Sequence, residues 1–245
     1  MGEQPSNIAV NSVTDTAYVS TLGGIYSIGG GGTANVYQPD VMSSRIAVNS
    51  ATNKIYVSDS SSVAVVDGVT HAATTVAVGA SADVIAVNEK TNKVFVSTAT
   101  GLKIIDGATN VATPIPNSAG AQDIAVNTAT NKTYALSAGT VKVIDASGKI
   151  TSTVSVGAGG IGAIAINPSK NKIYVTTTPK YGSTVKVIDG ATDKITGSLA
   201  SEGPLGTLAV NPATDKIYVE SGTWNSDGSI KVIDGATLTE SAQII

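Results

Sequence analysis

The chain has 245 residues, of which 42% are apolar and 13% are charged, and its formal net charge is -3. This composition predicts a folded chain, and the slight negative charge, without any run of Lys or Arg, argues against nucleic acid and anionic membranes as partners. No cysteine is present, which excludes disulfides, thiolate metal sites and a cysteine nucleophile. No apolar stretch reaches the length of about 18 residues that a membrane-spanning helix needs, so we expect no membrane insertion.

One short segment recurs six times along the chain. Its form is Ile-Ala-Val-Asn, exact or with one conservative change, and it occupies residues 8–11, 46–49, 85–88, 124–127, 164–167 and 208–211. A repeat period of about forty residues is typical of propellers, solenoids and other repeat arrays. The repeat therefore decides the fold class before any other feature does.

Each repeat contains the same elements in the same order. In the fifth repeat, a strand at 164–167 is followed by a turn at 167–172, a strand at 173–175, a variable loop and a strand at 185–189. A Gly-Ala-Thr turn and a fourth strand complete the unit. Four short strands separated by turn residues, with no helical period, predict an antiparallel meander, which is the blade of a β-propeller.

The sequence thus predicts an all-β fold, a six-bladed β-propeller with four antiparallel strands per blade. The two termini meet in phase in the link between a fourth and a first strand, so we expect every blade to be contiguous in sequence. Ring closure would then rest on packing between blades. We expect a single domain over 1–245, with blades at roughly 1–43, 44–82, 83–121, 122–161, 162–205 and 206–245.

Two motifs carry a resemblance to a known family. They are Asn-x-x-Thr-Asn-Lys-Ile-Tyr-Val at 49–57 and Val-Ile-Asp-Gly-Ala-Thr at 187–192 and 232–237. Both resemble the YVTN-type β-propeller repeat, and the match extends over nearly the whole chain. The resemblance implies a cell-surface, S-layer-like or periplasmic protein, commonly seven-bladed, with binding modules among the members and lactonases and lyases among related propellers. Six repeats depart from that ring size, and the first blade departs most, with Tyr-Ser-Ile-Gly-Gly at 26–30.

Residues that recur in every blade are predicted to build the blade. An Asp ends the third strand of five blades, where its carboxylate can accept hydrogen bonds from the N–H groups of the following turn; these residues are Asp67, Asp106, Asp145, Asp189 and Asp234. The aromatic residue of the second strand is Phe95 in one blade and Tyr in the others, which indicates that the ring is needed for packing between blades. His71 is the only histidine, and we interpret it as a solvated turn residue.

Breaks in the repeat are more informative about function. The loop between the second and third strands is short in the first four blades and expands in the last two, to 177–183 and 221–228. Binding residues concentrate on loops held by a rigid scaffold, and Trp and Tyr suit recognition surfaces. The predicted ligand-binding or partner-binding residues are Lys180, Tyr181, Trp224, Asn225 and Asp227. The alternative is that these loops are passive, with Trp224 folded over the blade edge.

A second candidate site lies at the expected channel mouth. Asp83 and Asp123 precede the innermost strands of neighbouring blades, and two carboxylates there are candidates for a hard cation such as Ca²⁺. Further oxygen ligands would be needed, and the corresponding positions of the last two blades carry Gly, Ala and Thr. We predict no other cofactor and no catalytic residue.

Three functions remain open at this point. The leading hypothesis is a non-catalytic extracellular, cell-surface or periplasmic module that binds a protein, a glycan or a wall component through the expanded loops. The alternatives are a metal-dependent lactonase-like or lyase-like hydrolytic enzyme at the channel mouth, and a passive lattice subunit or engineered regularised propeller. Residues 1–7 are too short and polar for a signal peptide, so export would require a targeting segment that this sequence does not contain. Neither the ligand nor the oligomeric state follows from the sequence.

Overall fold

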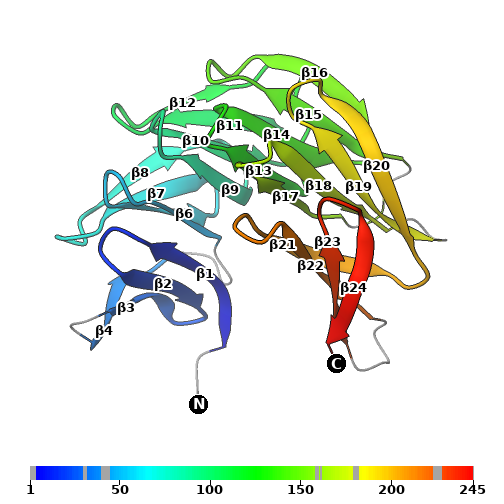
Figure 1. Ribbon diagram of the computed structural model, residues 1–245. Coiled ribbons are helices and arrows are strands. Elements are labelled where there is room, and N and C mark those ends of the chain that lie inside the picture. The colour runs from blue at the N-terminus through cyan, green and yellow to red at the C-terminus, as the bar shows by residue number, and fades with distance from the viewer. Residues whose placement is uncertain are drawn as a thin grey trace. The chain divides into compact units, whose positions relative to one another are not determined.

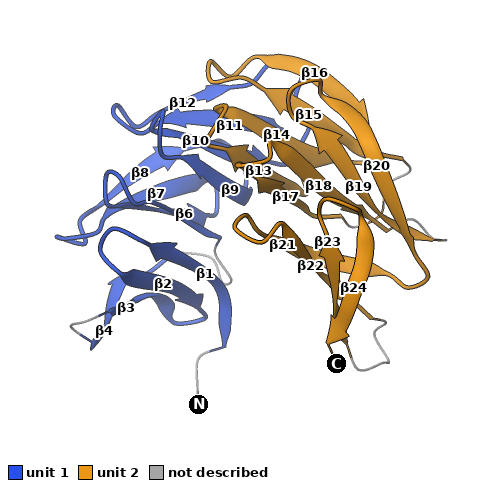
Figure 2. Ribbon diagram, viewed as in Figure 1, with its two compact units in different colours: residues 1–120 blue, residues 121–245 orange. Residues whose placement is uncertain are grey.

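The computed structural model describes residues 4–29, 32–39, 45–157, 160, 162–178, 182–222 and 228–244 (Figure 1). Regular structure in these segments consists of β-strands. Within them, no helix has the length and apolar character needed to cross a membrane. The chain divides into two compact units, residues 1–120 and 121–245 (Figure 2).

The first unit is made of three four-stranded antiparallel sheets, and each strand pairs with the next one in the chain. Their strands are β1 (Pro5–Asn11), β2 (Thr16–Thr21), β3 (Gly24–Gly29), β4 (Gly32–Tyr37), β5 (Ile46–Asn49), β6 (Lys54–Asp59), β7 (Ser62–Asp67), β8 (Ala73–Ala77), β9 (Ala82–Asn88), β10 (Lys93–Thr98), β11 (Gly101–Asp106) and β12 (Val111–Pro114).

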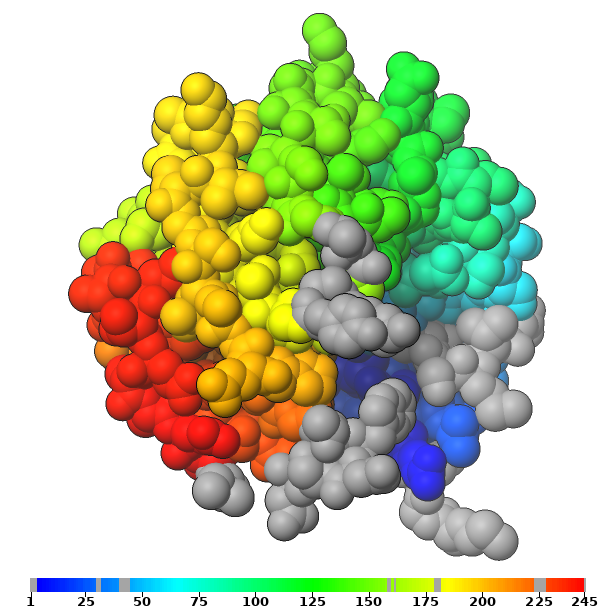
Figure 3. All heavy atoms as spheres, turned by 90° about the vertical axis from the view of Figure 1, so that its right-hand side faces the viewer, coloured from blue at the N-terminus to red at the C-terminus, as the bar shows by residue number. Residues whose placement is uncertain are grey.

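The second unit repeats this plan with three further sheets. Their strands are β13 (Asp123–Asn127), β14 (Lys132–Ser137), β15 (Thr140–Ile144), β16 (Ile150–Ser155), β17 (Ile164–Asn167), β18 (Lys172–Thr177), β19 (Ser183–Asp189), β20 (Lys194–Ser201), β21 (Leu205–Asn211), β22 (Lys216–Ser221), β23 (Ser229–Asp234) and β24 (Thr239–Ile244). The fourth strands β20 and β24 are largely exposed and lie at the surface in Figure 3.

Six four-stranded antiparallel sheets, each contiguous in sequence, confirm the predicted blades. Two blades begin one residue earlier than expected, since β9 starts at Ala82 and β21 at Leu205. In both, the first strand extends beyond the repeated Ile-Ala-Val-Asn segment and crosses a register shift. The expectation of one domain over the whole chain stays a prediction.

The core of each unit lies between successive sheets. One apolar cluster joins Tyr56 and Val65 of the second blade to Val94 and Ile105 of the third, and another joins the fourth blade to the fifth through Tyr134 and several aliphatic side chains. Side chains alternate along a strand, so the middle blade of each unit packs one face against the blade before it and the other face against the blade after it. Branched aliphatic residues and single aromatic rings fill these layers.

The aromatic position of the second strand serves packing, as predicted. Its rings are almost fully buried in five blades. The hydroxyls of Tyr56 and Tyr134 are buried without a hydrogen-bond partner within the described residues. Burial, and to a lesser extent the Asp106 carboxylate, raise the pKa of Tyr56 to about 12. At these two positions the ring alone is used, and Phe95 meets that requirement equally well. Tyr174 differs, since its hydroxyl donates to Asp215 Oδ1 and to the Gly235 carbonyl, both at 3.4 Å.

Candidate functional site

The recurring Asp residues hold the turn between the third and fourth strands. Asp67 Oδ1 accepts hydrogen bonds from the backbone N–H of Val69 at 2.9 Å and of Thr70 at 2.8 Å. The same bonds recur at Asp106, Asp189 and Asp234. Hydrogen bonds to the ionised carboxylate, chiefly from Thr70, lower the pKa of Asp67. The structural role predicted for these residues is confirmed.

Buried asparagines link successive blades at four junctions, two in each unit. Asn49 is fully buried, its Oδ1 accepts from the Thr52 N–H at 3.2 Å, and its Nδ2 donates to Asn92 Oδ1 of the following blade at 2.9 Å. Equivalent Nδ2 bonds join Asn11 to Asn53, Asn127 to Asn171, and Asn167 to Asp215. The acceptor residue adopts the left-handed conformation in each case. The repeated asparagine is therefore a turn cap and a bond between blades at once.

A lysine at the start of the second strand completes three of these junctions. Lys54 Nζ donates to the Gly107 carbonyl of the next blade at 2.7 Å, and Lys172 Nζ donates to the Gly235 carbonyl at 2.7 Å. Lys132 Nζ reaches the Gly190 carbonyl at 2.9 Å and also Asp193 Oδ1 at 2.8 Å. The ammonium thus fills the space between blades and satisfies a turn carbonyl. This role escaped sequence reasoning because donor and acceptor belong to different repeats.

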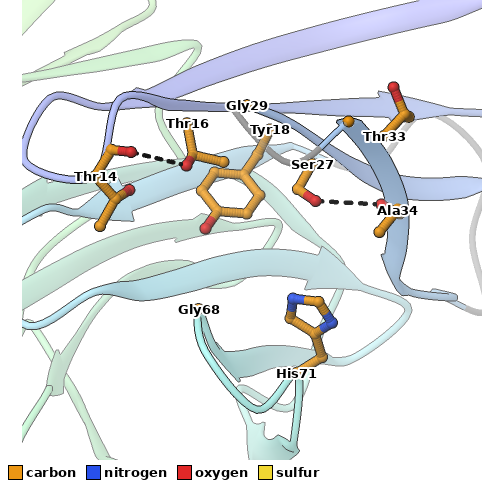
Figure 4. Close-up of a pocket in the computed structure, with 10 residues that line it drawn as sticks. Thr14, Thr16, Tyr18, Ser27, Gly29, Thr33, Ala34, Gly68 and His71 are labelled. Atoms are coloured by element: carbon orange, nitrogen blue, oxygen red, sulfur yellow. Dashed lines mark hydrogen bonds between the residues drawn. The ribbon is translucent and has the colours of Figure 1, made fainter.

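The first blade lacks this lysine. Thr16 occupies its position, Gly29 stands where the other blades have the Asp that ends the third strand, and Ser27 replaces an aliphatic residue opposite the aromatic ring. A pocket of about 260 Å³ lies at this junction. Figure 4 shows its walls, with Thr16 and Ser27 on the side of the first blade and His71 on the turn of the second.

His71 lies on a turn, as predicted, and is exposed, but it also lines this pocket. Its φ of 59° is left-handed, as is that of Asp193 at the same turn position of the fifth blade. The sequence contains a signal for the pocket, since residues 26–30 are the strongest departure from the repeat. The sequence alone did not show that Thr16 matters. The role of the lysine that it replaces becomes visible only with the glycine turn of the next blade, whose carbonyl accepts from that lysine.

The residues predicted for recognition, Lys180, Tyr181, Trp224, Asn225 and Asp227, lie outside the described residues. The stems of both loops are described. Thr178 Oγ1 donates to the Leu205 carbonyl at 2.7 Å, and Leu205 pairs with Ser221 across β21 and β22. The base of the fifth-blade loop is thereby bonded to the strand pair that carries the sixth-blade loop.

The two candidate cation ligands fall in different units. Asp83 is exposed in β9, and its Oδ1 accepts from Ser81 Oγ at 3.3 Å. Asp123 Oδ1 accepts from the Ile124 N–H and Oδ2 from the Ile164 N–H, both at 2.9 Å. Asp123 therefore joins the fourth blade to the fifth. Within the described part of the chain, no group of three or more His, Asp or Glu side chains is placed to hold a metal ion.

Comparisons with known proteins identify the architecture. No protein-family model and no curated protein matches the sequence. Among solved structures, the chain is similar to a dihydro-heme d1 dehydrogenase NirN in complex with DHE, with a TM-score of 0.73 and 17% identity over 98% of this chain and 57% of that one. A chain of the mitotic checkpoint complex gives a TM-score of 0.80 with 14% identity, over 100% of this chain and 78% of that one. Hydrazine synthase of Kuenenia stuttgartiensis gives 0.74 with 17% identity, over 98% and 86%.

These similarities extend over essentially the whole chain and establish a β-propeller fold. The identities are too low to carry function, and the chain spans just over half of the NirN chain. Matches number 1041 chains, so the fold is too widely shared to select one activity. The chain is thus a β-propeller built from six contiguous four-stranded blades.

Proposed function

We propose that this chain is a non-catalytic binding or scaffold module of the YVTN-repeat type, acting outside the cell, at its surface or in the periplasm. It recognises a protein, glycan or wall component through the expanded loops of the fifth and sixth blades. The observation that carries the proposal is the bonded path from Thr178 through Leu205 to Ser221, which ties the stems of both loops together. A shared, rigid base is what a composite recognition surface on two loops requires.

The use of the repeated polar residues supports the same function. The Asp, Asn and Lys side chains of the described blade junctions are engaged in turn caps and in bonds between blades. Recognition then falls to positions that the repeat does not share. The fifth-blade loop leaves β18 after Thr177, which is buried and bonds Thr184 Oγ1 at 2.8 Å, so its stem is held tightly.

The enzyme alternative has less support. It needs carboxylates free to bind a divalent cation, whereas both oxygens of Asp123 accept main-chain hydrogen bonds from Ile124 and Ile164. A carboxylate used in this way loses part of its capacity to coordinate a metal.

Replacing Tyr181 and Trp224 together by Ala tests the proposal. We expect the double variant to lose the signals that the parent protein gives on glycan and protein arrays, while its melting temperature stays within a few degrees because the stems remain paired. Val111→Ala is the control, since it shortens an exposed apolar side chain at the start of β12, 57% accessible and distant in sequence from both loops. Array signals that survive the double substitution, or that Val111→Ala also removes, would contradict a site on these loops.

A further inference from the structure

The pocket at the junction of the first two blades marks the place of a missing lysine. Its lining includes Thr16, Tyr18, Ser27, Gly68 and His71, all in the first unit. In the three complete junctions, a lysine ammonium lies 2.7–2.9 Å from the carbonyl that corresponds to that of Gly68. The sequence changes that open the pocket are all in the first blade, so the acceptor side is left unchanged.

The backbone of the acceptor turn is the same in all four junctions. The Gly68 N–H donates to the Asn53 carbonyl at 2.9 Å, and the equivalent bonds from Gly107, Gly190 and Gly235 are each 2.8 Å. The His71 N–H donates to the Asp67 carbonyl at 2.9 Å, and the turns of the third, fifth and sixth blades have the same bond at 2.7–2.8 Å. The Gly68 carbonyl therefore has the orientation that receives an ammonium group elsewhere.

The alignment of the two blades is also unchanged. Asn11 Nδ2 donates to Asn53 Oδ1 at 2.8 Å, as the matching residues do in the complete junctions at 2.6–2.9 Å. The buried ring of Tyr18 supplies an apolar wall, and Figure 4 shows its hydroxyl directed toward Gly68. The space differs from a complete junction mainly in its missing aliphatic stem and ammonium.

The charge around the pocket is suited to a cation. Burial, followed by the negative charge of Asp67, raises the pKa of the Tyr18 hydroxyl, so this lining residue lies within reach of a carboxylate, which Lys54 also faces. His71 takes the turn position at which Asp193 accepts from Lys132 in the fifth blade, and a neutral imidazole also offers a nitrogen acceptor. The pocket volume of about 260 Å³ equals the liquid volume of roughly nine water molecules, at about 30 Å³ each. This is enough room for a four-carbon alkylammonium, which has five non-hydrogen atoms.

We propose that this pocket is a binding site for a primary ammonium group on a short alkyl stem, held by the Gly68 carbonyl, the Tyr18 hydroxyl and His71. The ligand takes the place of the lysine that Thr16 replaces. Its source is either a free alkylamine or a lysine side chain of a partner, because both present the same group. These residues differ from those of the expanded loops, so either proposal can fail without the other.

Titration of the intact chain with n-butylammonium chloride, followed by NMR of His71 and of the threonine methyls, tests the site at about pH 8, where an alkylamine is protonated. We expect saturable shifts for n-butylammonium and none for 1-butanol, which has the stem without the charge. Binding by 1-butanol of equal strength, or no saturable shift with n-butylammonium, would overturn the proposal. Nα-acetyl-lysine amide is the second probe: tighter binding of this compound supports a partner's lysine as the source, and tighter binding of n-butylammonium supports a free amine.

Two substitutions move the affinity in opposite directions. Thr16→Lys supplies the missing ammonium within the chain and is expected to abolish n-butylammonium binding, with folding checked by an unchanged or higher melting temperature. His71→Asp introduces the acceptor of the fifth blade and is expected to tighten binding about tenfold, as one charge-assisted hydrogen bond would do.

The matched control for His71→Asp is Asn110→Asp. It places a carboxylate at the same turn position of the third blade, where Lys54 already donates to Gly107, and is expected to leave the affinity unchanged. Retained binding in Thr16→Lys, or an equal gain from Asn110→Asp and His71→Asp, would overturn the assignment to this pocket. A converse variant, Lys132→Thr, takes the ammonium away from the Gly190 carbonyl and Asp193 and is expected to raise the number of n-butylammonium sites from one to two.

Discussion

Two junctions share one framework of hydrogen bonds, that between the first and second blades and that between the fifth and sixth. They differ in the side chain that occupies the space between the blades. Both have the buried asparagine, the left-handed acceptor residue and the glycine turn. Lys172 completes the latter by donating to Gly235, whereas Thr16 leaves the former with a pocket. The comparison teaches that side-chain hydrogen bonds from the buried asparagine to the left-handed Asn or Asp of the next blade set the arrangement of blades, and that the lysine is not needed for it.

The largest expected effect is on the shared framework. Asn167→Ala removes an Nδ2 bond to Asp215 at 2.6 Å and the bond that the Lys170 N–H donates to Oδ1, so we expect a loss of about 3 kcal/mol in the free energy of unfolding. Asn11→Ala removes the equivalent bonds and should cost a similar amount. Denaturant titration of both variants measures this. A much smaller loss for Asn11→Ala would mean that the two junctions do not share one framework.

The interblade lysine should contribute less to the free energy of unfolding than the asparagine does. Lys172→Thr deletes one charged hydrogen bond to a carbonyl and its stem packing, and we expect a loss of about 1 kcal/mol. Thr16→Lys makes the corresponding bond to Gly68 possible and should stabilise the first unit by up to about 1 kcal/mol. Thermal unfolding of the two variants compares them directly. Destabilisation by Thr16→Lys would show that the junction of the first two blades has no room for the lysine side chain that the other three junctions contain.

Acid should affect the blades that carry the Asp at the end of the third strand. The Lys93 ammonium and the N–H groups of Ala108 and Thr109 lower the pKa of Asp106 from its ordinary value of 3.8 to about 2. A depressed folded-state pKa stabilises the protein above the ordinary value, and this contribution is lost as pH falls from about 4 toward about 2. Unfolding curves over that range should show a weaker pH dependence in Asp106→Asn. The first blade has Gly29 at this position, so Gly29→Ala serves as the comparison without a carboxylate.

The smallest effect is expected at the aromatic position. Tyr56→Phe removes a buried hydroxyl that has no hydrogen-bond partner within the described residues, so unfolding should be unchanged or slightly harder, by at most about 1 kcal/mol. Tyr18→Phe should likewise leave stability nearly unchanged but weaken n-butylammonium binding at the pocket. Calorimetry measures the first change and the NMR titration the second. A clear stability loss in Tyr56→Phe would mean that its hydroxyl has a bonding role.

Much of the fold could be predicted from the residues because each blade is local in sequence. The paired strands β5 and β6 are joined by the turn that Asn49 caps, and the turn after β7 is held by Asp67. Alternation, turn residues and the repeat period report such contacts within a few residues of one another. The candidate site could be predicted less well from the sequence. The predicted loop residues lie outside the described part of the chain, and Asp123 accepts a hydrogen bond from the next blade.

By itself, the sequence determined the number of blades, the order of their four strands and the structural use of the repeated Asp, because these depend on short-range periodicity and turn chemistry. Tertiary structure alone decided which residues meet between blades. Lys54 and Gly107 are 53 residues apart, and the sequence around either residue does not predict that the two are in contact. The pocket beside Thr16 and His71 belongs to this second class, because a missing side chain becomes a site only when the neighbouring blade supplies its acceptor.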